Sequence, residues 1–262
     1  MRGFKTIKKQ PTQPQSQPQY EVADVLNKLG SKLEDLGLNS WQLRTLFALK
    51  KCRTSALGGH IDACDECGNI SISYNSCRNR HCPKCQGRNR EDWIQTRETE
   101  LLPVPYFHVV FTLPEVLNKT ALHEPKMLYD ILFESAWETL QTFGKNKNLQ
   151  MGMIAVLHTW GQNLSLHPHL HCIVPGGGVD ENGAWKNIKN DGKFLFSVKA
   201  LSKVFRAKFC EKLKANLKDK FNENQENEYE KIRQSLWEKP WVVYAKKPFG
   251  SPKSVVEYLG RY

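Results

Sequence analysis

Two cysteine pairs constrain this chain more than any other feature of its 262 residues. Cys64 and Cys67 are separated by two residues, and Cys82 and Cys85 repeat that spacing after fourteen intervening residues. Two such knuckles can supply four thiolates at the tetrahedral geometry that zinc prefers. The segment is short and polar, so metal binding would supply the folding free energy that apolar burial cannot. The pattern predicts a structural zinc ion on these four cysteines.

Four more residues of metal-ligand type lie close to these pairs and leave two interpretations open. They are Cys52, His60, Cys77 and His81. In the first interpretation they hold a second zinc ion, with Cys77 and His81 as one of the ligand pairs that alternate along the chain between two metals. In the second, the cysteines are small buried hydrophobic residues and the histidines form hydrogen bonds or contact phosphate. The zinc content per chain distinguishes the two.

A histidine-rich segment, residues 167–171, reads His-Pro-His-Leu-His. Alternate residues of an extended strand point to one face, so its imidazoles line up. Neutral imidazole is a common ligand for divalent metals, and a site with His169 and His171 keeps positions open for a substrate oxygen. The segment predicts a catalytic metal site. The alternative is a polar edge strand whose histidines face water.

A third metal ligand is expected, because two imidazoles hold an ion poorly. His158 lies eleven residues before His169 on the preceding predicted strand, and a hairpin would bring the two together. His158 is therefore the first candidate. His167 and Gln162 are alternatives closer in the sequence.

Two tyrosines close the chain, Tyr258 and Tyr262. Residues four apart share one face of a helix. Neighbouring apolar residues such as Val255, Val256 and Leu259 can supply the packing face, which leaves the phenols for another role. The alternative is that these tyrosines are ordinary core or surface aromatics.

Together, these motifs resemble the rolling-circle transposases of the two-tyrosine HUH class, nucleases with a His-hydrophobic-His motif that carry an N-terminal zinc-binding domain. The segment His169-Leu170-His171 matches that motif. The resemblance runs from about Cys52 to Tyr262 and includes three further segments: residues 76–86, 107–114 and 175–178.

The resemblance implies a transposase that nicks single-stranded DNA at the ends of a mobile element and transfers the strand. Tyr258 or Tyr262 would attack phosphorus and form a 5′-phosphotyrosine, and two phenols would allow two such links at once. Mg²⁺ or Mn²⁺ on His158, His169 and His171 would polarise the scissile phosphate. Single-stranded or hairpin DNA is the expected partner.

Two other classes of protein fit the same features. One is a catalytically inactive, zinc-dependent DNA-binding protein, and the other is a replication initiator or relaxase-type nickase. The family continues beyond the tyrosine helix, so the chain is expected to be truncated after Tyr262, with an incomplete nuclease domain. A tyrosine at a frayed chain end would be poorly positioned for catalysis.

Charge and hydropathy restrict the partners and the compartment. The formal net charge of +11 implies a polyanionic partner, with nucleic acid favoured over an anionic membrane surface. A basic cluster between residues 199 and 220 fits that partner or simply completes an amphipathic helix. No apolar run is long enough for a membrane span or a secretion signal, and metal-type cysteine pairs favour a reducing cytoplasm. We expect a cytoplasmic, nucleoid-associated protein.

Three regions are expected along the chain: a disordered leader (1–20), a helical and zinc-binding DNA-recognition domain (21–102) and a nuclease domain (103–262). Periodicity predicts an α+β fold, and the resemblance implies an RRM-like antiparallel sheet. The expected helices are 21–36, 40–50, 93–102, 124–143, 198–221 and one that starts at 251–252. The expected strands are 106–113, 153–159, 170–174 and 241–245, with an acidic, polar insertion at 222–230.

Overall fold

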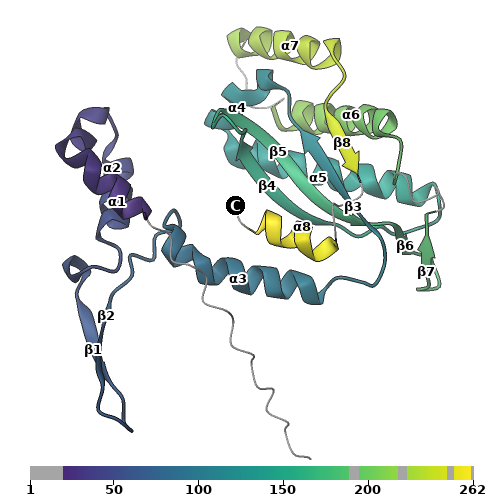
Figure 1. Cartoon of the computed structure of the whole chain (residues 1–262). Coiled ribbons are helices and arrows are strands. Elements are labelled where there is room, and N and C mark those ends of the chain that lie inside the picture. Colours follow the sequence, from purple (N-terminus) through teal and green to yellow (C-terminus); the bar gives the residue numbers. More distant parts are fainter. Residues whose placement is uncertain (1–19, 189–194, 218–222, 247–250, 261–262) are drawn as a thin grey trace, which may run out of the picture. The chain divides into compact units, whose positions relative to one another are not determined.

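A computed structural model describes residues 20–188, 195–217, 223–246 and 251–260 of the chain (Figure 1). The chain divides into two compact units, Met1–Glu91 and Asp92–Tyr262, which are treated separately below. The predicted leader falls almost entirely outside the described residues, and so does Tyr262. Within the described residues, no helix is both long and apolar enough to cross a membrane.

The first unit begins with short helices that enclose a small apolar cluster. α1 (Val22–Leu29) continues into a 3₁₀ turn η1 (Gly30–Leu36), and α2 (Ser40–Lys51) follows. Asn39 caps α2, because its side chain accepts the amide of Gln42 at 2.9 Å while the Gln42 side chain accepts the amide of Asn39. The helices bury a small cluster made of Leu26, Leu33, Leu49, Cys52 and Cys82.

After η2 (Ser55–Leu57), the first unit continues as an antiparallel hairpin. Its strands are β1 (Gly59–Ala63) and β2 (Ile70–Tyr74). The chain then enters α3 (Pro83–Thr99), which starts ten residues before the helix that the sequence predicts at 93–102. Pro83 suits the first turn of a helix, where its missing N–H costs no hydrogen bond.

The second unit is built on a four-stranded antiparallel sheet with the order β4-β5-β3-β8. Its strands fall at the positions predicted from the sequence: β3 (Tyr106–Thr112), β4 (Ile154–Trp160), β5 (Leu166–Pro175) and β8 (Val243–Lys246). Side chains alternate between the two faces of each strand. The predicted α+β class with an antiparallel sheet is confirmed.

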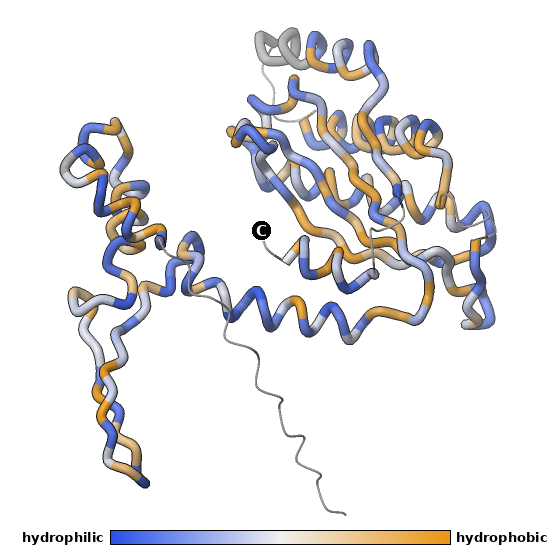
Figure 2. Tube along the Cα trace, viewed as in Figure 1, coloured by the Kyte–Doolittle hydropathy of each residue, from blue (hydrophilic) through white to orange (hydrophobic). Residues whose placement is uncertain are grey.

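Two long helices, α5 (Pro125–Lys145) and α6 (Val198–Leu217), pack on one face of this sheet. Figure 2 shows apolar residues concentrated along the central strands and on these helices. Phe111 from β3 and Phe205 from α6 are completely buried, with ring centroids 4.9 Å apart. Burial of one such ring contributes about 2 to 3 kcal/mol, so this layer holds most of the unit's stability.

The other face of the sheet receives α8 (Pro252–Leu259) and the second half of α3. Ser251 caps α8 by accepting the amide of Ser254, with Pro252 in the first turn, as the sequence predicts. Val256 and Leu259 are fully buried against Ile173 of β5 and Ile94 of α3. This packing fixes the last described helix beside the histidine-bearing strands.

Residues 223–230 of the expected acidic, polar insertion are helical, and residue 222 lies outside the described residues. Helix α7 (Glu223–Glu238) begins with them. Ile232 and Leu236, one turn apart on this helix, pack against the main core, so the acidic start belongs to an amphipathic helix. The remaining elements are short: η3 (Glu115–Leu117), α4 (Asn118–His123), β6 (Gly177–Val179) and β7 (Trp185–Asn187).

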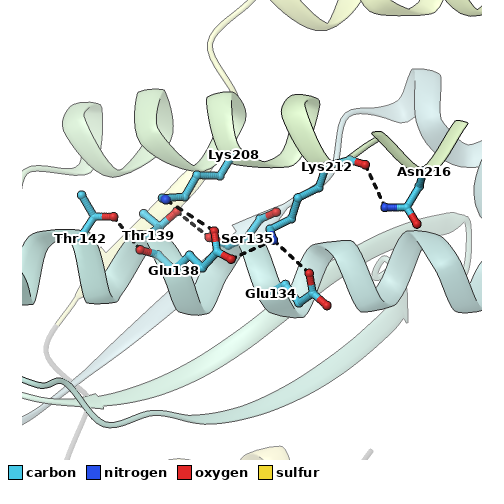
Figure 3. A network of polar contacts seen from close by, with 8 residues as sticks. All are labelled: Glu134, Ser135, Glu138, Thr139, Thr142, Lys208, Lys212 and Asn216. Carbon is cyan, nitrogen blue, oxygen red and sulfur yellow. Dashed lines mark hydrogen bonds and ion pairs between the residues drawn. The ribbon is translucent and has the colours of Figure 1, made fainter. Parts of the chain in front are cut away.

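Part of the basic cluster on α6 serves helix packing. Lys212 forms ion pairs with Glu138 at 2.8 Å and with Glu134 at 3.0 Å, and Lys208 lies 3.5 Å from Glu138 (Figure 3). Both carboxylates belong to α5. Two of the lysines thus join α5 to α6.

Candidate active site and metal centres

Three histidines meet on the sheet face opposite α5 and α6. His158 of β4 lies directly across from His169 of β5, and His171 follows two residues later on the same face. Each offers a ring nitrogen within 4.8 Å of the others. Among the alternatives considered for the third ligand, His158 is the one that joins His169 and His171, as the hairpin argument predicts.

Hydrogen bonds orient two of these rings. Nδ1 of His169 lies 2.6 Å from the carbonyl oxygen of His167, which can only accept, so this nitrogen donates. Nε2 of His169 is then left as its lone-pair nitrogen. His108 of β3 places Nε2 2.7 Å from Nδ1 of His171. His108 is not among the metal ligands predicted from the sequence, although strand alternation on β3 puts it on the same face.

The environment keeps these histidines neutral. Burial, reinforced by the neighbouring imidazoles, lowers the pKa of His171 to about 3 and that of His158 to about 4. Burial also lowers the pKa of His169. A metal binds the neutral imidazole, so the rings are in the ligand form near neutral pH without losing a proton. The donor set therefore fits a divalent metal ion.

A pocket of about 830 Å³ opens over this cluster, and Tyr258 of α8 lines it together with the three histidines. His167 and Gln162 also line the pocket, although His167 is outside the close group of ring nitrogens. Tyr258 is 44% exposed, while its neighbours Val255, Val256 and Leu259 are buried. Two of the three predicted elements of the active site, the histidines and one tyrosine, thus lie around one cavity. The third, Tyr262, lies outside the described residues.

A second cluster of ligand atoms lies in the first unit. The thiols of Cys52, Cys77, Cys82 and Cys85 all lie within 4.8 Å of one another. The sulfur of Cys52 is 3.5 Å from that of Cys85 and 3.6 Å from that of Cys82, and it accepts the backbone amide of Cys77 at 3.4 Å. Four thiols at this spacing fit tetrahedral zinc. We call this set the cysteine tetrad.

The electrostatics of the tetrad favour one thiolate among several thiols. Burial raises the pKa of Cys85, but hydrogen bonds from Cys52, Cys77 and Cys82 outweigh it and bring the pKa to about 7. Burial raises the pKa of Cys77 and of Cys52. Zinc takes thiolates, so its binding would displace the remaining protons.

The tetrad differs from the four cysteines that the sequence analysis selects. Cys64 and Cys67 are exposed at the turn between β1 and β2 and do not join Cys82 and Cys85. Each strand has five residues, enough to carry the turn about 17 Å from the hairpin base. Cys52 and Cys77, for which the sequence allows either a second zinc site or a buried apolar role, complete the set instead.

The second zinc site, suggested for Cys77 and His81 with Cys52 and His60, is not assembled in the described residues. Both cysteines belong to the tetrad. His81 contacts the ring of Trp41 at a centroid distance of 5.7 Å, and His60 lies 3.6 Å from Asp62 on the hairpin. Neither histidine is part of a candidate metal group.

Comparison with known families matches both parts of the chain. A family described as "Transposase zinc-binding domain" matches residues 24–113, and one described as "Putative transposase" matches residues 152–262. The first match spans the cysteine tetrad, and the second spans the histidine cluster and Tyr258. The two matches assign the motifs in these segments to transposase domains, in agreement with the resemblance drawn from them.

Two relatives support this assignment. "Putative transposase y4qJ" of Sinorhizobium fredii (strain NBRC 101917 / NGR234) is 42% identical over 255 residues, which are 92% of this chain and 64% of that protein. The "Transposase for insertion sequence element IS801" of Pseudomonas savastanoi pv. phaseolicola is 35% identical over 158 residues, 60% of this chain and 38% of that protein. The chain thus spans less than two thirds of the length of each.

Solved structures with some likeness include complexes of the conjugative relaxase TrwC with DNA. One, with a 27-mer that comprises the recognition hairpin and the cleavage site, has a TM-score of 0.32 and 16% identity over 41% of this chain and 44% of that one. Another, with mutant OriT DNA, has a TM-score of 0.34 and 11% identity over 91% and 92%.

Proposed function

We propose that this chain is a DNA strand transferase that cuts single-stranded DNA through a covalent tyrosine intermediate, as in rolling-circle transposition. One observation carries the proposal: His158, His169, His171 and Tyr258 line a single pocket. The match of residues 152–262 to a transposase family supports it, and the net charge of +11 suits a nucleic-acid substrate.

In this mechanism Tyr258 is the nucleophile. Its phenolic oxygen attacks phosphorus, an O–P bond to tyrosine forms, and the bond from phosphorus to the 3′ oxygen breaks. The phenol proton goes to solvent, and the departing 3′ oxygen takes up a proton. The 5′-phosphotyrosine conserves the phosphodiester energy, so a later 3′-hydroxyl can reverse the step and receive the strand without a nucleotide cofactor.

The histidines would hold the metal. His158, His169 and His171 would bind one divalent ion, which we propose to be Mg²⁺ or Mn²⁺. When bound, such an ion supplies positive charge next to a non-bridging phosphate oxygen. His167 fixes the orientation of His169 through its carbonyl oxygen, so at least one ligand is preorganised before DNA arrives.

We assign the other two functional elements of the sequence as follows. The cysteine tetrad would hold a structural zinc ion in the unit that recognises DNA. Tyr262 would be a second nucleophile, so that two covalent links could coexist during one strand-transfer cycle. Single-stranded or hairpin DNA is the proposed substrate, because the backbone phosphates of unpaired nucleotides can reach a pocket on the surface of a sheet.

Covalent capture tests the proposal. The purified chain is incubated with Mn²⁺ and single-stranded oligonucleotides that tile both flanks of its coding sequence. Each oligonucleotide carries its label at the 3′ end, which stays with the phosphotyrosine fragment. A labelled band at the mass of protein plus DNA on a denaturing gel is expected, and it should vanish in Tyr258→Phe. Tyr244→Phe is the matched control, since Tyr244 is 46% exposed on β8 and does not line the pocket.

The other outcomes separate the competing classes. Binding of DNA without an adduct in any tile would favour the inactive DNA-binding protein. Adducts confined to a plasmid replication or transfer origin would favour the initiator or relaxase class. An adduct that survives in Tyr258→Phe but not in Tyr262→Phe would move the first nucleophilic step to the terminal tyrosine.

A further inference from the structure

The turn between β1 and β2 carries two thiols that the cysteine tetrad does not use. Cys64 and Cys67 are both exposed there. The backbone amides of Glu66 and Cys67 donate hydrogen bonds to the thiol of Cys64. Two main-chain bonds close the turn, from the amide of Gly68 to the carbonyl of Cys64 at 2.8 Å and from the amide of Cys64 to the carbonyl of Asn69 at 2.9 Å. This arrangement directs amides at a sulfur, as a zinc knuckle requires.

This knuckle is only half of a zinc site. Structural zinc takes four ligands. Within the described residues, the His, Cys, Asp and Glu side chains form two groups of three or more candidate ligands, and neither group contains Cys64 or Cys67. Two ligands are therefore missing from the part of the chain that the structure describes.

One face of the same hairpin is apolar and exposed. The strand register pairs Ile61 with Ile72 and Ala63 with Ile70, and directly paired residues share a face. Ile61, Ile70 and Ile72 are 70%, 66% and 62% exposed. An isolated two-stranded hairpin is marginally stable in water, so an uncovered face of this kind indicates a contact surface.

The opposite face of the hairpin is polar. Asp62 accepts a hydrogen bond from the hydroxyl of Ser73 at 2.8 Å and lies 3.6 Å from His60. The hairpin therefore has one face suited to water and one suited to a partner, and the partner face runs up to the knuckle.

We propose that two copies of this chain pair through their hairpins, with their apolar faces in contact and one zinc ion shared between the two knuckles. A two-fold arrangement brings Cys64 and Cys67 from each copy to the axis and completes a set of four thiolates. The second copy is the favoured occupant because the chain itself carries both the missing thiols and a matching apolar face. This inference does not depend on DNA cleavage.

Zinc, rather than the apolar contact, would decide whether the pair forms. The apolar face has few large side chains, whereas a standard interface uses about 20 to 30 residues per partner. Asp65 and Glu66 also place like charges at each tip, and these repel when two tips meet. The positive charge of zinc offsets that repulsion, so the dimer should be lost on chelation.

Zinc stoichiometry and mass, measured together on the full chain, test the proposal. Light scattering should report a dimer, and elemental analysis three zinc ions per two chains: one in each cysteine tetrad and one shared. The double variant Cys64→Ser, Cys67→Ser should be monomeric with one zinc ion per chain. Cys210→Ser, in α6, is the control and should keep both properties.

A second pair of variants leaves every cysteine intact. Ile72→Lys places a charge on the apolar face and should weaken dimerisation at least tenfold, whereas Ser71→Lys on the polar face should change it little. A monomer with two zinc ions per chain would overturn the proposal, because each chain would then complete its own second site. A dimer that persists in the double cysteine variant would place the interface elsewhere.

Discussion

At the scale of single residues, the chemistry of the histidine cluster depends on which ring nitrogen is already engaged. The His167 carbonyl oxygen accepts a hydrogen bond from Nδ1 of His169, and Nε2 of His108 forms a hydrogen bond with Nδ1 of His171. The first contact leaves Nε2 of His169 for a metal, and the second leaves Nε2 of His171 for a metal when Nδ1 of His171 is the donor. Partners of this kind fix ring orientation and typically contribute tenfold to a hundredfold in metal affinity.

Replacement of a ligand should weaken metal binding strongly. His169→Ala removes one of three imidazoles and the ring that His167 orients, so Mn²⁺ affinity should fall at least tenfold. Isothermal titration calorimetry measures this directly, in a zinc-loaded protein so that the cysteine tetrad does not compete. His123→Ala, at an exposed position on α4, should leave the affinity unchanged. Equal affinities in both variants would remove His169 from the metal site.

Cys52 offers a sharp test of the zinc ligands, because it belongs to the tetrad but lies outside the two Cys-x-x-Cys pairs. Cys52→Ser should lose the tetrad zinc, about one ion per chain by elemental analysis, and destabilise the helices of the first unit. The ion would remain if Cys64 and Cys67 completed the site with Cys82 and Cys85. Retention of zinc in Cys52→Ser would therefore favour the four ligands that the Cys-x-x-Cys spacing predicts.

Local spacing predicts ligands only when the chain between them is regular. His169 and His171 follow from strand alternation, and His158 follows from a hairpin whose register the pattern implies. Cys52 and Cys77 do not follow, because one ends α2 and the other lies beyond a hairpin of unpredicted length. Folding of the unit brings these two cysteines together, and no periodic pattern in the sequence marks such a contact.

At the scale of elements, α5 and α6 are joined by burial and by charge. Phe205 and Phe209 of α6 are completely buried in the main core. At the solvent edge of the same contact, Lys212 bridges Glu134 and Glu138 (Figure 3). The apolar layer supplies the stability, and the ion pairs add a smaller, pH-dependent increment.

Lys212→Met should lower the free energy of unfolding by roughly 0.5 to 1 kcal/mol at neutral pH, since methionine keeps an apolar stem but loses the charge. The hydrogen bond from Lys212 lowers the pKa of Glu138 below its ordinary value of 4.5. A carboxylate with a lowered pKa stabilises the fold above its ordinary pKa, and this contribution is lost as the pH falls through the folded value. Urea unfolding should thus show the wild type and the variant converging as the pH falls below 4.5 and through the lowered pKa of Glu138.

Elements with strong periodicity were predictable from the sequence, and those defined by long-range packing were not. The four strands of the main sheet and the helices α5 and α6 fall where the apolar pattern predicts them. The start of α3 and the whole of α7 were missed, because both begin in polar sequence. Packing of Ile94 and Leu236 against apolar clusters fixes these helices instead.

At the scale of the whole molecule, the two units rest on different sources of stability. The first unit buries only a small cluster around Leu26, Leu33 and Leu49, and two of the buried residues beside it are tetrad cysteines. The second unit has a continuous core between the sheet and two long helices. Structural zinc contributes on the order of 10 kcal/mol, enough to decide folding of the first unit but not needed by the second.

Removal of zinc should therefore unfold one unit and spare the other. After treatment with a strong chelator, hydrogen exchange followed by mass spectrometry should show amides of α2 losing protection while amides of β3 and β5 stay protected. Zinc added back should restore protection in α2. Protection that persists in α2 without zinc would mean that apolar burial alone holds the first unit. Simultaneous loss in both units would mean that they unfold as one cooperative body.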